Sequence, residues 1–272
     1  MKTFRLIGMG LIAVLMSFTI ASCGDDEEDD STIENPNKPN LSTDKRLVQV
    51  KVEYYEGHGV DHVDFELEYD NQGRVISLIE YEEDGTIDNV HSIKYSENSI
   101  ILTGKTDYLP SVTTFIVGDG RIVAGTEDGD HGYYTHTHSY SYNSYNYLNE
   151  IKGDLGERTF TWSENKLIET KDYIDKSRDH YYFEYDNKTC KGYNPAIISW
   201  GVVAEEEDLI FTFIAANPEL IGFKTNHLPK RAIAGDEYVN FSYELDDDGY
   251  LKKCVEVANN GEDPKAYTFV WE

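Results

Sequence analysis

A run of histidine and tyrosine residues between positions 131 and 145 has the residue types and spacing best suited to chemistry in this sequence. If the run is a β-strand, side chains alternate between its two faces, and every second residue points the same way. One face then carries five rings, those of Tyr134, His136, His138, Tyr140 and Tyr142. Tyrosine rings can stack on the faces of sugars, and phenol and imidazole groups hydrogen-bond to hydroxyl groups. The stripe therefore predicts contact with a ligand.

Two other interpretations of the same stripe stay open. His136 and His138 lie two residues apart on one strand face, so they can share a transition metal if a third ligand comes from elsewhere in the fold. The stripe can also be the polar and aromatic face of a strand that partly lines a wet barrel interior, with no ligand.

The rest of the sequence carries no signature of catalysis. It contains no Gly-x-Ser-x-Gly motif for a nucleophilic serine, no His-Glu-x-x-His zinc motif and no phosphate-binding loop. Pairs of carboxylates carry no information, because the chain has 51 Asp and Glu residues. We therefore assign no catalytic residue and expect no cofactor.

Two functional hypotheses from different classes follow. The first is a non-enzymatic binding or accessory protein that contacts a glycan, a peptide or a protein, and it predicts an exposed aromatic patch. The alternative is a metal-dependent or carboxylate hydrolase that acts on extracellular polymers. That alternative predicts that His136 and His138 converge with another His, Asp or Glu.

The N-terminus has the organisation of a bacterial lipoprotein leader. Lys2 and Arg5 precede an apolar run from Leu6 to Ile20, which is too short for a comfortable membrane-spanning helix. Small residues then lead directly to Cys23, and this arrangement resembles the lipobox at which a peptidase cuts before a lipidated cysteine. We expect residues 1–22 to be a signal peptide and Cys23 to carry the lipid, which is then the only link to the membrane.

Residues 23–43 are predicted to be a flexible acidic linker. Six consecutive acids at 25–30 repel one another and cannot fold, and prolines and asparagines follow them. The acidic run resembles the export signal that carries Bacteroidetes lipoproteins to the cell surface. We therefore expect a location on the outer membrane, facing the cell exterior, with the periplasmic face as the alternative. The sequence Asp-Ser-Thr at 30–32 also resembles an O-glycosylation sequon, with Ser31 as the acceptor.

Charge and cysteine content narrow the class of protein further. The formal net charge is −27, and cleavage before Cys23 removes two cations and no acid. Such a surface disfavours binding to nucleic acids, which require a basic face. Besides Cys23 there are only Cys190 and Cys254. In an oxidising compartment these two can form one disulfide, or they can be two small buried side chains.

Residues 44–272 are predicted to be a single all-β domain. Apolar residues alternate strictly with polar ones, as in Phe65, Leu67 and Tyr69 against Asp64, Glu66, Glu68 and Asp70. Asp-Gly and Asn-Gly pairs separate these runs, and they tolerate the positive φ angles of tight hairpins. The pattern indicates a many-stranded antiparallel meander. The exception is residues 205–217, where acids precede an apolar run limited by Pro218, and there we predict one short helix.

A loose internal repeat runs through the domain. Residues 65–78 are echoed by residues 241–254, each with an aromatic strand, an acidic turn with glycine, and a returning apolar strand. Shorter echoes are Gly-Arg-Ile at 120–122, Tyr-Leu at 147–148 and Asn-Lys-Leu at 165–167.

These hairpins, together with Asn-His-Leu-Pro-Lys at 226–230 and the closing Tyr-x-Phe-x-Trp-Glu, resemble one group of Bacteroidetes lipoproteins. These are domains of unknown function described as having a porin-like fold, and the resemblance spans roughly residues 45–272. It implies a many-stranded antiparallel barrel or half-barrel, and it implies no activity. A membrane-spanning barrel needs strands of about 9–11 residues with a lipid-facing apolar row. The apolar rows here are short and flanked by acids, so we expect a soluble barrel or half-barrel.

Overall fold

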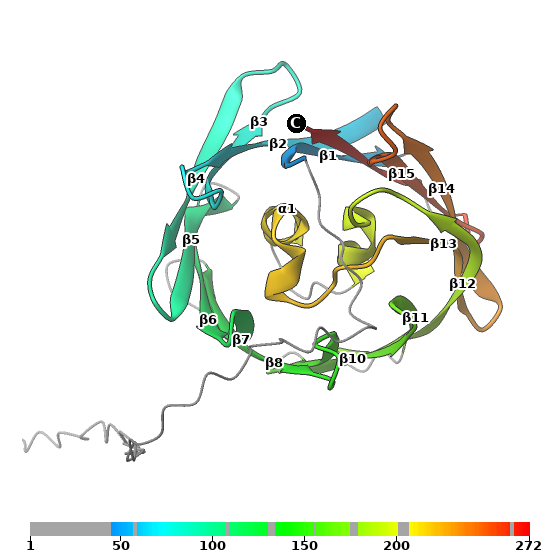
Figure 1. Ribbon diagram of the computed structural model, residues 1–272. Coiled ribbons are helices and arrows are strands. Elements are labelled where there is room, and N and C mark those ends of the chain that lie inside the picture. The colour runs from blue at the N-terminus through cyan, green and yellow to red at the C-terminus, as the bar shows by residue number, and fades with distance from the viewer. Residues whose placement is uncertain are drawn as a thin grey trace, which may run out of the picture. The chain divides into compact units, whose positions relative to one another are not determined.

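The computed structural model describes residues 45–56, 59–106, 109–129, 134–154, 156–174, 179–200, 207–261 and 264–272. Contacts divide the chain into Met1–Asn35 and Pro36–Glu272, and all described residues belong to the second unit. In that unit sixteen antiparallel strands close into one barrel, in which each strand pairs with its neighbours in sequence and β1 pairs with β16 (Figure 1).

The strands are β1 (Leu47–Glu56), β2 (Gly59–Tyr69), β3 (Val75–Tyr81), β4 (Ile87–Tyr95), β5 (Ser99–Thr106), β6 (Leu109–Gly118), β7 (Arg121–Gly129), β8 (Tyr134–Tyr142), β9 (Leu148–Gly153), β10 (Gly156–Ser163), β11 (Lys166–Ile174), β12 (Asp179–Thr189), β13 (His227–Ala234), β14 (Glu237–Leu245), β15 (Leu251–Ala258) and β16 (Lys265–Trp271). The helices are η2 (Pro195–Trp200), α1 (Glu207–Ala216) and η3 (Pro218–Leu220). The predicted all-β fold is confirmed, the barrel is closed, and the one α-helix of the described residues lies within the predicted range 205–217.

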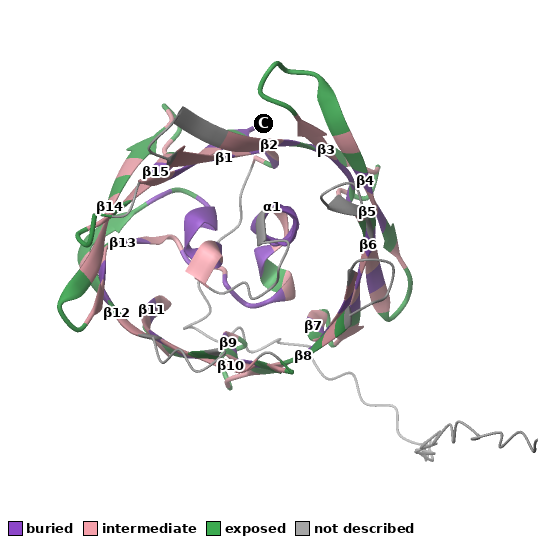
Figure 2. Ribbon diagram, turned by 180° about the vertical axis from the view of Figure 1, so that it is seen from behind, coloured by how far each residue is buried: buried purple, intermediate pink, exposed green. Residues whose placement is uncertain are grey.

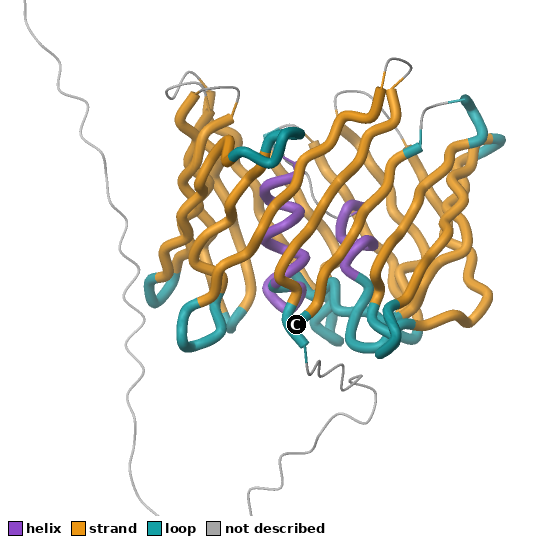
Figure 3. Tube along the Cα trace, turned by 90° about the horizontal axis from the view of Figure 1, so that it is seen from above, coloured by secondary structure: helices purple, strands orange, loops and turns teal. Residues whose placement is uncertain are grey.

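The two ends of the barrel differ in their connections (Figure 3). At one end, which we call the turn end, tight turns join β2 to β3, β6 to β7, β8 to β9 and β14 to β15. At the opposite end, which we call the loop end, the chain passes from β1 to β2, from β3 to β4, from β7 to β8 and likewise within each later pair of strands. The half of the interior nearest each end is named after it below.

In almost every hairpin of the series β1–β2, β3–β4 and so on to β15–β16, an aromatic side chain links the two strands at the turn end. Tyr or Trp near the end of the second strand donates a hydrogen bond to the main-chain carbonyl that begins the first strand, over 2.5–2.9 Å. The donors are Tyr69, Tyr95, Tyr142, Trp162, Tyr185, Tyr243 and Trp271. We call these bonds the aromatic clamps. The hairpin β5–β6 has Val117 at the equivalent place and no such donor.

The clamps explain the internal repeat of the sequence. In Gly-Arg-Val at 73–75, the glycine adopts φ +80°, and the Arg74 guanidinium lies 4.8 Å from the ring centre of Tyr95. The carbonyl of Val75 then accepts the hydrogen bond of Tyr95. Arg121 covers the clamp ring of Tyr142 in the same way. The repeated triplet therefore supplies a turn, a cover for an aromatic ring and an acceptor.

A plug formed by residues 190–200 and 207–226, between β12 and β13, occupies the barrel interior (Figures 1 and 3). From Leu209 onward its helix α1 is apolar except for Thr212, and residues 209–215 are all buried. A helix of this kind is stable only where apolar surfaces surround it. Asn217 ends the helix, because its side-chain amide donates to the carbonyl of Phe213 over 2.8 Å and Pro218 follows.

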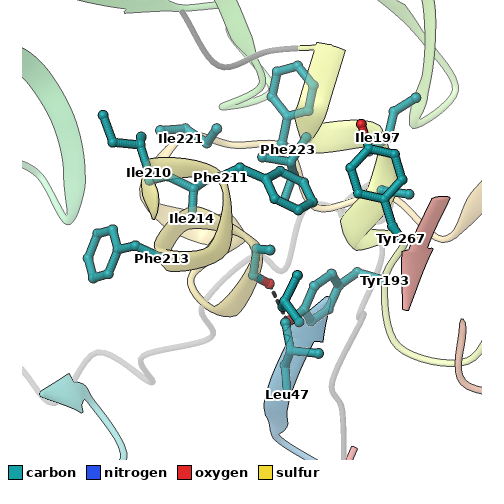
Figure 4. Close-up of a cluster of buried hydrophobic side chains, with 14 of the residues drawn as sticks. Leu47, Tyr193, Ile197, Ile210, Phe211, Phe213, Ile214, Ile221, Phe223 and Tyr267 are labelled. Atoms are coloured by element: carbon teal, nitrogen blue, oxygen red, sulfur yellow. Dashed lines mark hydrogen bonds between the residues drawn. The ribbon is translucent and has the colours of Figure 1, made fainter. Parts of the chain in front are cut away.

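The plug and the inner faces of the strands form one hydrophobic core (Figures 2 and 4). The ring of Phe213 stacks on Phe115 of β6 with centroids 6.2 Å apart, and Tyr193 donates to the carbonyl of Ala215 over 2.7 Å. Phe223 is fully buried and meets Phe160 edge-on. No described helix is long and apolar enough to cross a membrane.

The outer face of the barrel is polar along the strands. The outward positions of β2 include Asp64, Glu66 and Glu68. On β8 the outward positions are all Ser or Thr, namely Thr135, Thr137, Ser139 and Ser141. Cross-strand ion pairs and hydrogen bonds link outward side chains, such as Lys253 with Glu53 at 3.7 Å. The exposed large apolar side chains are scattered over many strands rather than forming a continuous belt in the described residues.

Cys190 and Cys254 are free, buried thiols. No disulfide joins these two side chains in the structure. Burial raises the pKa of Cys190 to about 12 and raises the pKa of Cys254 well above its usual value. Both thiols are therefore protonated and unreactive at neutral pH.

Candidate functional site in the barrel interior

The predicted Tyr and His stripe lies on β8 and faces the barrel interior. His136 pairs with Glu127 of β7, and His138 pairs with Gly125, whose neighbours on the same face are core residues. Tyr140 pairs with the buried Ile151 of β9. The shared face is therefore as predicted. The side chain of Tyr134 lies outside the described set.

Two residues of the stripe, Tyr140 and Tyr142, belong to the packed core. Tyr142 donates to the carbonyl of Ile122 as a clamp and also lies 3.2 Å from the carbonyl of Leu220, which ties the plug to the barrel wall. Tyr140 packs against the core, and burial raises its pKa above the usual range for tyrosine. These two rings stabilise the fold and are not a solvent-exposed patch for a ligand.

His136 and His138 lie nearer to the loop end than these two rings do. The His136 side chain is 15% exposed, and its Nδ1 lies 3.8 Å from a carboxylate oxygen of Asp154. His138 is 8% exposed, and burial lowers its pKa because a protonated imidazole would lose its hydration. Access to the imidazoles from the loop end is therefore narrow, and ligand contact by this stripe stays a prediction.

The metal interpretation lacks a third ligand in the described part of the chain. No three His, Cys, Asp or Glu side chains there are arranged to hold a metal ion.

Further polar groups line the loop half of the interior, and sequence reasoning missed them. On β3 and β4, Glu80 and the buried His91 contact each other at 2.8 Å between Oε2 and Nε2. On β10 and β11, Nε of Arg158 donates to Asp172 over 2.8 Å. These residues stand at inward positions of strands whose turn-end halves are apolar. The sequence does carry one signal for them, because polar residues replace apolar ones at the inward positions in one half of these strands.

A further member of this polar set is Glu256 on β15. Its Oε1 accepts from the indole nitrogen of Trp200 over 3.3 Å, and burial raises its pKa to about 7. The ring of Trp200 is surrounded edge-on by aromatic side chains of β12 and β14, namely Tyr181, Phe183 and Phe241. The carboxyl group is therefore held at the border between the aromatic plug and the polar loop half.

Comparison with known proteins places this fold. A family model described as a domain of unknown function (DUF4595) with a porin-like fold matches residues 67–253. The chain belongs to this family. The closed barrel agrees with the fold in the family's description. Comparison with curated proteins gives no significant match in sequence.

Two solved structures share the fold at low sequence identity. A porin-like protein from Bacteroides uniformis is 17% identical, with a TM-score of 0.64, over 83% of this chain and 96% of that one. A porin-like protein from Bacteroides vulgatus is also 17% identical, with a TM-score of 0.52, over 82% of this chain and 97% of that one. The likeness covers nearly the full length of each of these two solved structures.

The predicted lipidation at Cys23 and O-glycosylation at Ser31 lie outside the described residues, as do the signal peptide and the acidic linker. They stay predictions from the sequence.

Proposed function

We propose that this protein is a lipid-anchored binding or accessory protein of the outer membrane whose barrel stands in water and conducts nothing. The anchor is the lipid on Cys23, and the acidic linker holds the domain away from the membrane on the cell surface. Its ligand is a glycan, a peptide or a protein, and no catalytic step is assigned to it.

The polarity of the barrel carries this proposal. A barrel that spans a bilayer presents an apolar band about 25 Å tall to lipid and keeps its polar side chains inside. Here the outward faces carry charged residues along their length, such as Lys51, Glu66 and Glu169, while the turn half of the interior is apolar. A lysine or arginine facing lipid near the midplane would cost about 2–4 kcal/mol, and an acidic side chain would cost less. The observed arrangement suits water outside.

The plug supports the absence of conduction. α1 and the segment that follows it fill the interior with fully buried rings, including Phe213 and Phe223. Tyr142 bonds both to the barrel wall and to the plug, so the plug is fixed by hydrogen bonds as well as by packing. A path for ions through the turn half would require the core to unfold.

A binding role suits the remaining features. A closed barrel is a rigid scaffold whose connections at both ends are free to carry recognition residues. The β8–β9 turn holds the exposed Tyr145, and Tyr173 near the end of β11 is also exposed. The hydrolase alternative gains no geometric support from the described residues, which contain no three-residue metal cluster.

The anchor and the location are tested in one experiment. The full chain and Cys23→Ala are expressed in a Bacteroides host with labelled palmitate, and the membranes are separated. The wild type is expected in the outer membrane with label, and protease added to intact cells should degrade it. The variant should carry no label and leave the membrane fraction. Label-free wild type, or membrane retention of the variant that resists salt and alkali, would contradict the proposal.

A further inference from the structure

A pocket of about 260 Å³ opens at the turn end, and none of its lining residues belongs to the predicted stripe. Three segments far apart in sequence form its walls. These are the β6–β7 turn with the start of β7, the β8–β9 turn, and the end of the plug at residues 219–224. No single stretch of sequence would therefore reveal it.

The walls of the pocket are held rigidly. The ring of Tyr147 stacks on Trp162 with centroids 4.8 Å apart, and its hydroxyl donates to Asn165 over 2.8 Å. The plug touches the β8–β9 turn directly at Gly222, which adopts φ +64°. A Cβ at that position would lie 2.3 Å from the carbonyl oxygen of Asn146, so only glycine fits. A site built on such fixed elements pays little ordering entropy when a ligand binds.

The β8–β9 turn differs from two otherwise equivalent turns. In each, an Asp or Asn side chain accepts hydrogen bonds from the main-chain nitrogens two and four residues later; the acceptors are Asp70, Asn143 and Asp246. The residue three positions after the acceptor has positive φ. It is glycine in two turns, at positions 73 and 249, but Asn146, with φ +69°, in the third.

The asparagine at this strained position has a role in the pocket. Nη1 of Arg121 donates to Oδ1 of Asn146 over 2.7 Å, which fixes the guanidinium at the pocket wall. A glycine would fit the turn better but would leave Arg121 without this acceptor. Unfavourable main-chain conformations of this kind tend to persist at functional sites.

The exposed residue of the same turn is aromatic. Tyr145 lines the pocket and is 59% exposed, whereas its counterparts in the other two turns are Gln72 and Asp248. A tyrosine ring left in water at the mouth of a pocket offers a flat surface for an apolar ligand face.

The charges around the pocket cancel. Arg121 and Lys224 stand against Asp119 and Glu219, so the formal charge of the lining is zero in a protein of net charge −27. Among the described residues, Asp119, Glu219 and Lys224 make no ion pair. Their charged groups are therefore available as hydrogen-bond donors and acceptors. A balanced set of both kinds beside an aromatic ring suits a neutral polyhydroxylated ligand better than an ion.

We propose that this pocket binds one neutral sugar residue of a glycan, with its apolar C–H face on Tyr145 and its hydroxyl groups bonded to Arg121, Lys224 and Glu219. The volume lies slightly below the roughly 300–1,000 Å³ of pockets for drug-sized ligands, so it holds one ring rather than an extended chain. This inference rests on the proposed binding function and names its ligand class and its site.

Saturation-transfer NMR tests the proposal. The full chain is purified in a polyoxyethylene detergent, which has no sugar headgroup, and mixed with methyl glycosides of neutral hexoses and N-acetylhexosamines. At least one glycoside is expected to receive saturation from the wild type. Tyr145→Ala should weaken its binding by about tenfold or more, as loss of an aromatic contact at the centre of a site usually does. Gln72→Ala, the matched change in the β2–β3 turn, should leave binding unchanged.

Asn146→Gly separates a binding role from a structural one. Glycine is favoured at φ +69°, so the thermal midpoint should stay equal or rise, while sugar binding weakens because Arg121 loses its acceptor. Binding that persists in Tyr145→Ala places the sugar elsewhere and overturns this site. If no glycoside binds but a peptide mixture does, the sugar proposal fails and the binding function stands. If neither binds, both fail.

Discussion

The two halves of the barrel interior are built from the same strands but have opposite chemistry. In the turn half, aromatic clamps, cations over aromatic rings and the apolar plug make a largely apolar core. In the loop half, the inward positions of the same strands hold Glu80, His91, Glu127, His138 and Glu256.

We expect stability and pH dependence to arise in different halves of this fold. Apolar burial and satisfied main-chain carbonyls stabilise the turn half without regard to pH. Buried acids and imidazoles in the loop half cost desolvation, and their protonation states depend on pH. Substitutions in the two halves should therefore differ in their pH profiles as well as in size.

The largest effect is expected from Phe223→Ala in the turn half. Phe223 is fully buried and contacts Phe160 and Trp162 edge-on, so its removal leaves a cavity between plug and wall. The free energy of unfolding should fall by about 3–5 kcal/mol. Urea denaturation at pH 5 and pH 8 should give the same loss. A loss that changes strongly with pH would break the distinction between the halves.

A clamp substitution should give the next largest effect. Tyr185→Phe removes the hydroxyl that donates to the carbonyl of Leu167 over 2.7 Å and leaves that carbonyl without this bond. We expect the free energy of unfolding to fall by about 1–3 kcal/mol. Tyr182→Phe, on the same strand but 51% exposed, is the control and should have almost no effect. Equal effects of the two would show that the clamps do not stabilise the hairpins.

In the loop half, Glu256→Gln is expected to stabilise the protein at high pH. The folded state raises the pKa of Glu256 from 4.5 to about 7, so the folded protein binds the proton more tightly than the unfolded chain. Stability from this group is present at low pH and is lost as the pH rises from about 4.5 to 7. The free energy of unfolding of Glu256→Gln should exceed that of wild type by roughly 1–3 kcal/mol at pH 8, because each pKa unit corresponds to about 1.4 kcal/mol, and should almost equal it at pH 4. The reverse order would contradict burial of the carboxyl group.

The smallest effect concerns His138, whose pKa the folded state lowers through burial. The unfolded chain then binds more protons, so this group reduces stability as the pH falls below its unfolded pKa of about 6.5. His138→Gln should therefore make the decline in thermal midpoint between pH 7 and pH 5 shallower. A steeper decline in the variant would show that the protonated imidazole is favoured in the folded protein.

Much of the fold was predictable from local patterns, and the interior was not. Strict alternation in residues 64–70 fixed the inward and outward faces of β2, and acids followed by an apolar run predicted α1. Closure depends on β1 pairing with β16, which are separated by nearly the whole domain, so no local pattern reports it. That the apolar helix is a plug follows only once the barrel surrounds it.

The candidate site was predicted in part. The shared face of His136, His138 and Tyr140 followed from period two, but whether it pointed to water or to the core depended on barrel closure. The turn-end pocket was missed because Arg121, Tyr145 and Lys224 come from three distant segments. Its one local sign is an Asn-Ser-Tyr-Asn turn at 143–146, where the related turns end in glycine.

The polar outward positions of the strands imply that the outer face of this barrel meets water. Sedimentation of the domain at residues 44–272, refolded in buffer without detergent, tests it most directly. We expect a discrete, soluble species with the far-ultraviolet spectrum of a β-barrel. Aggregation in buffer together with recovery of a folded species only in detergent or lipid would contradict it, and would mean that the charged outer face is lipid-facing after all.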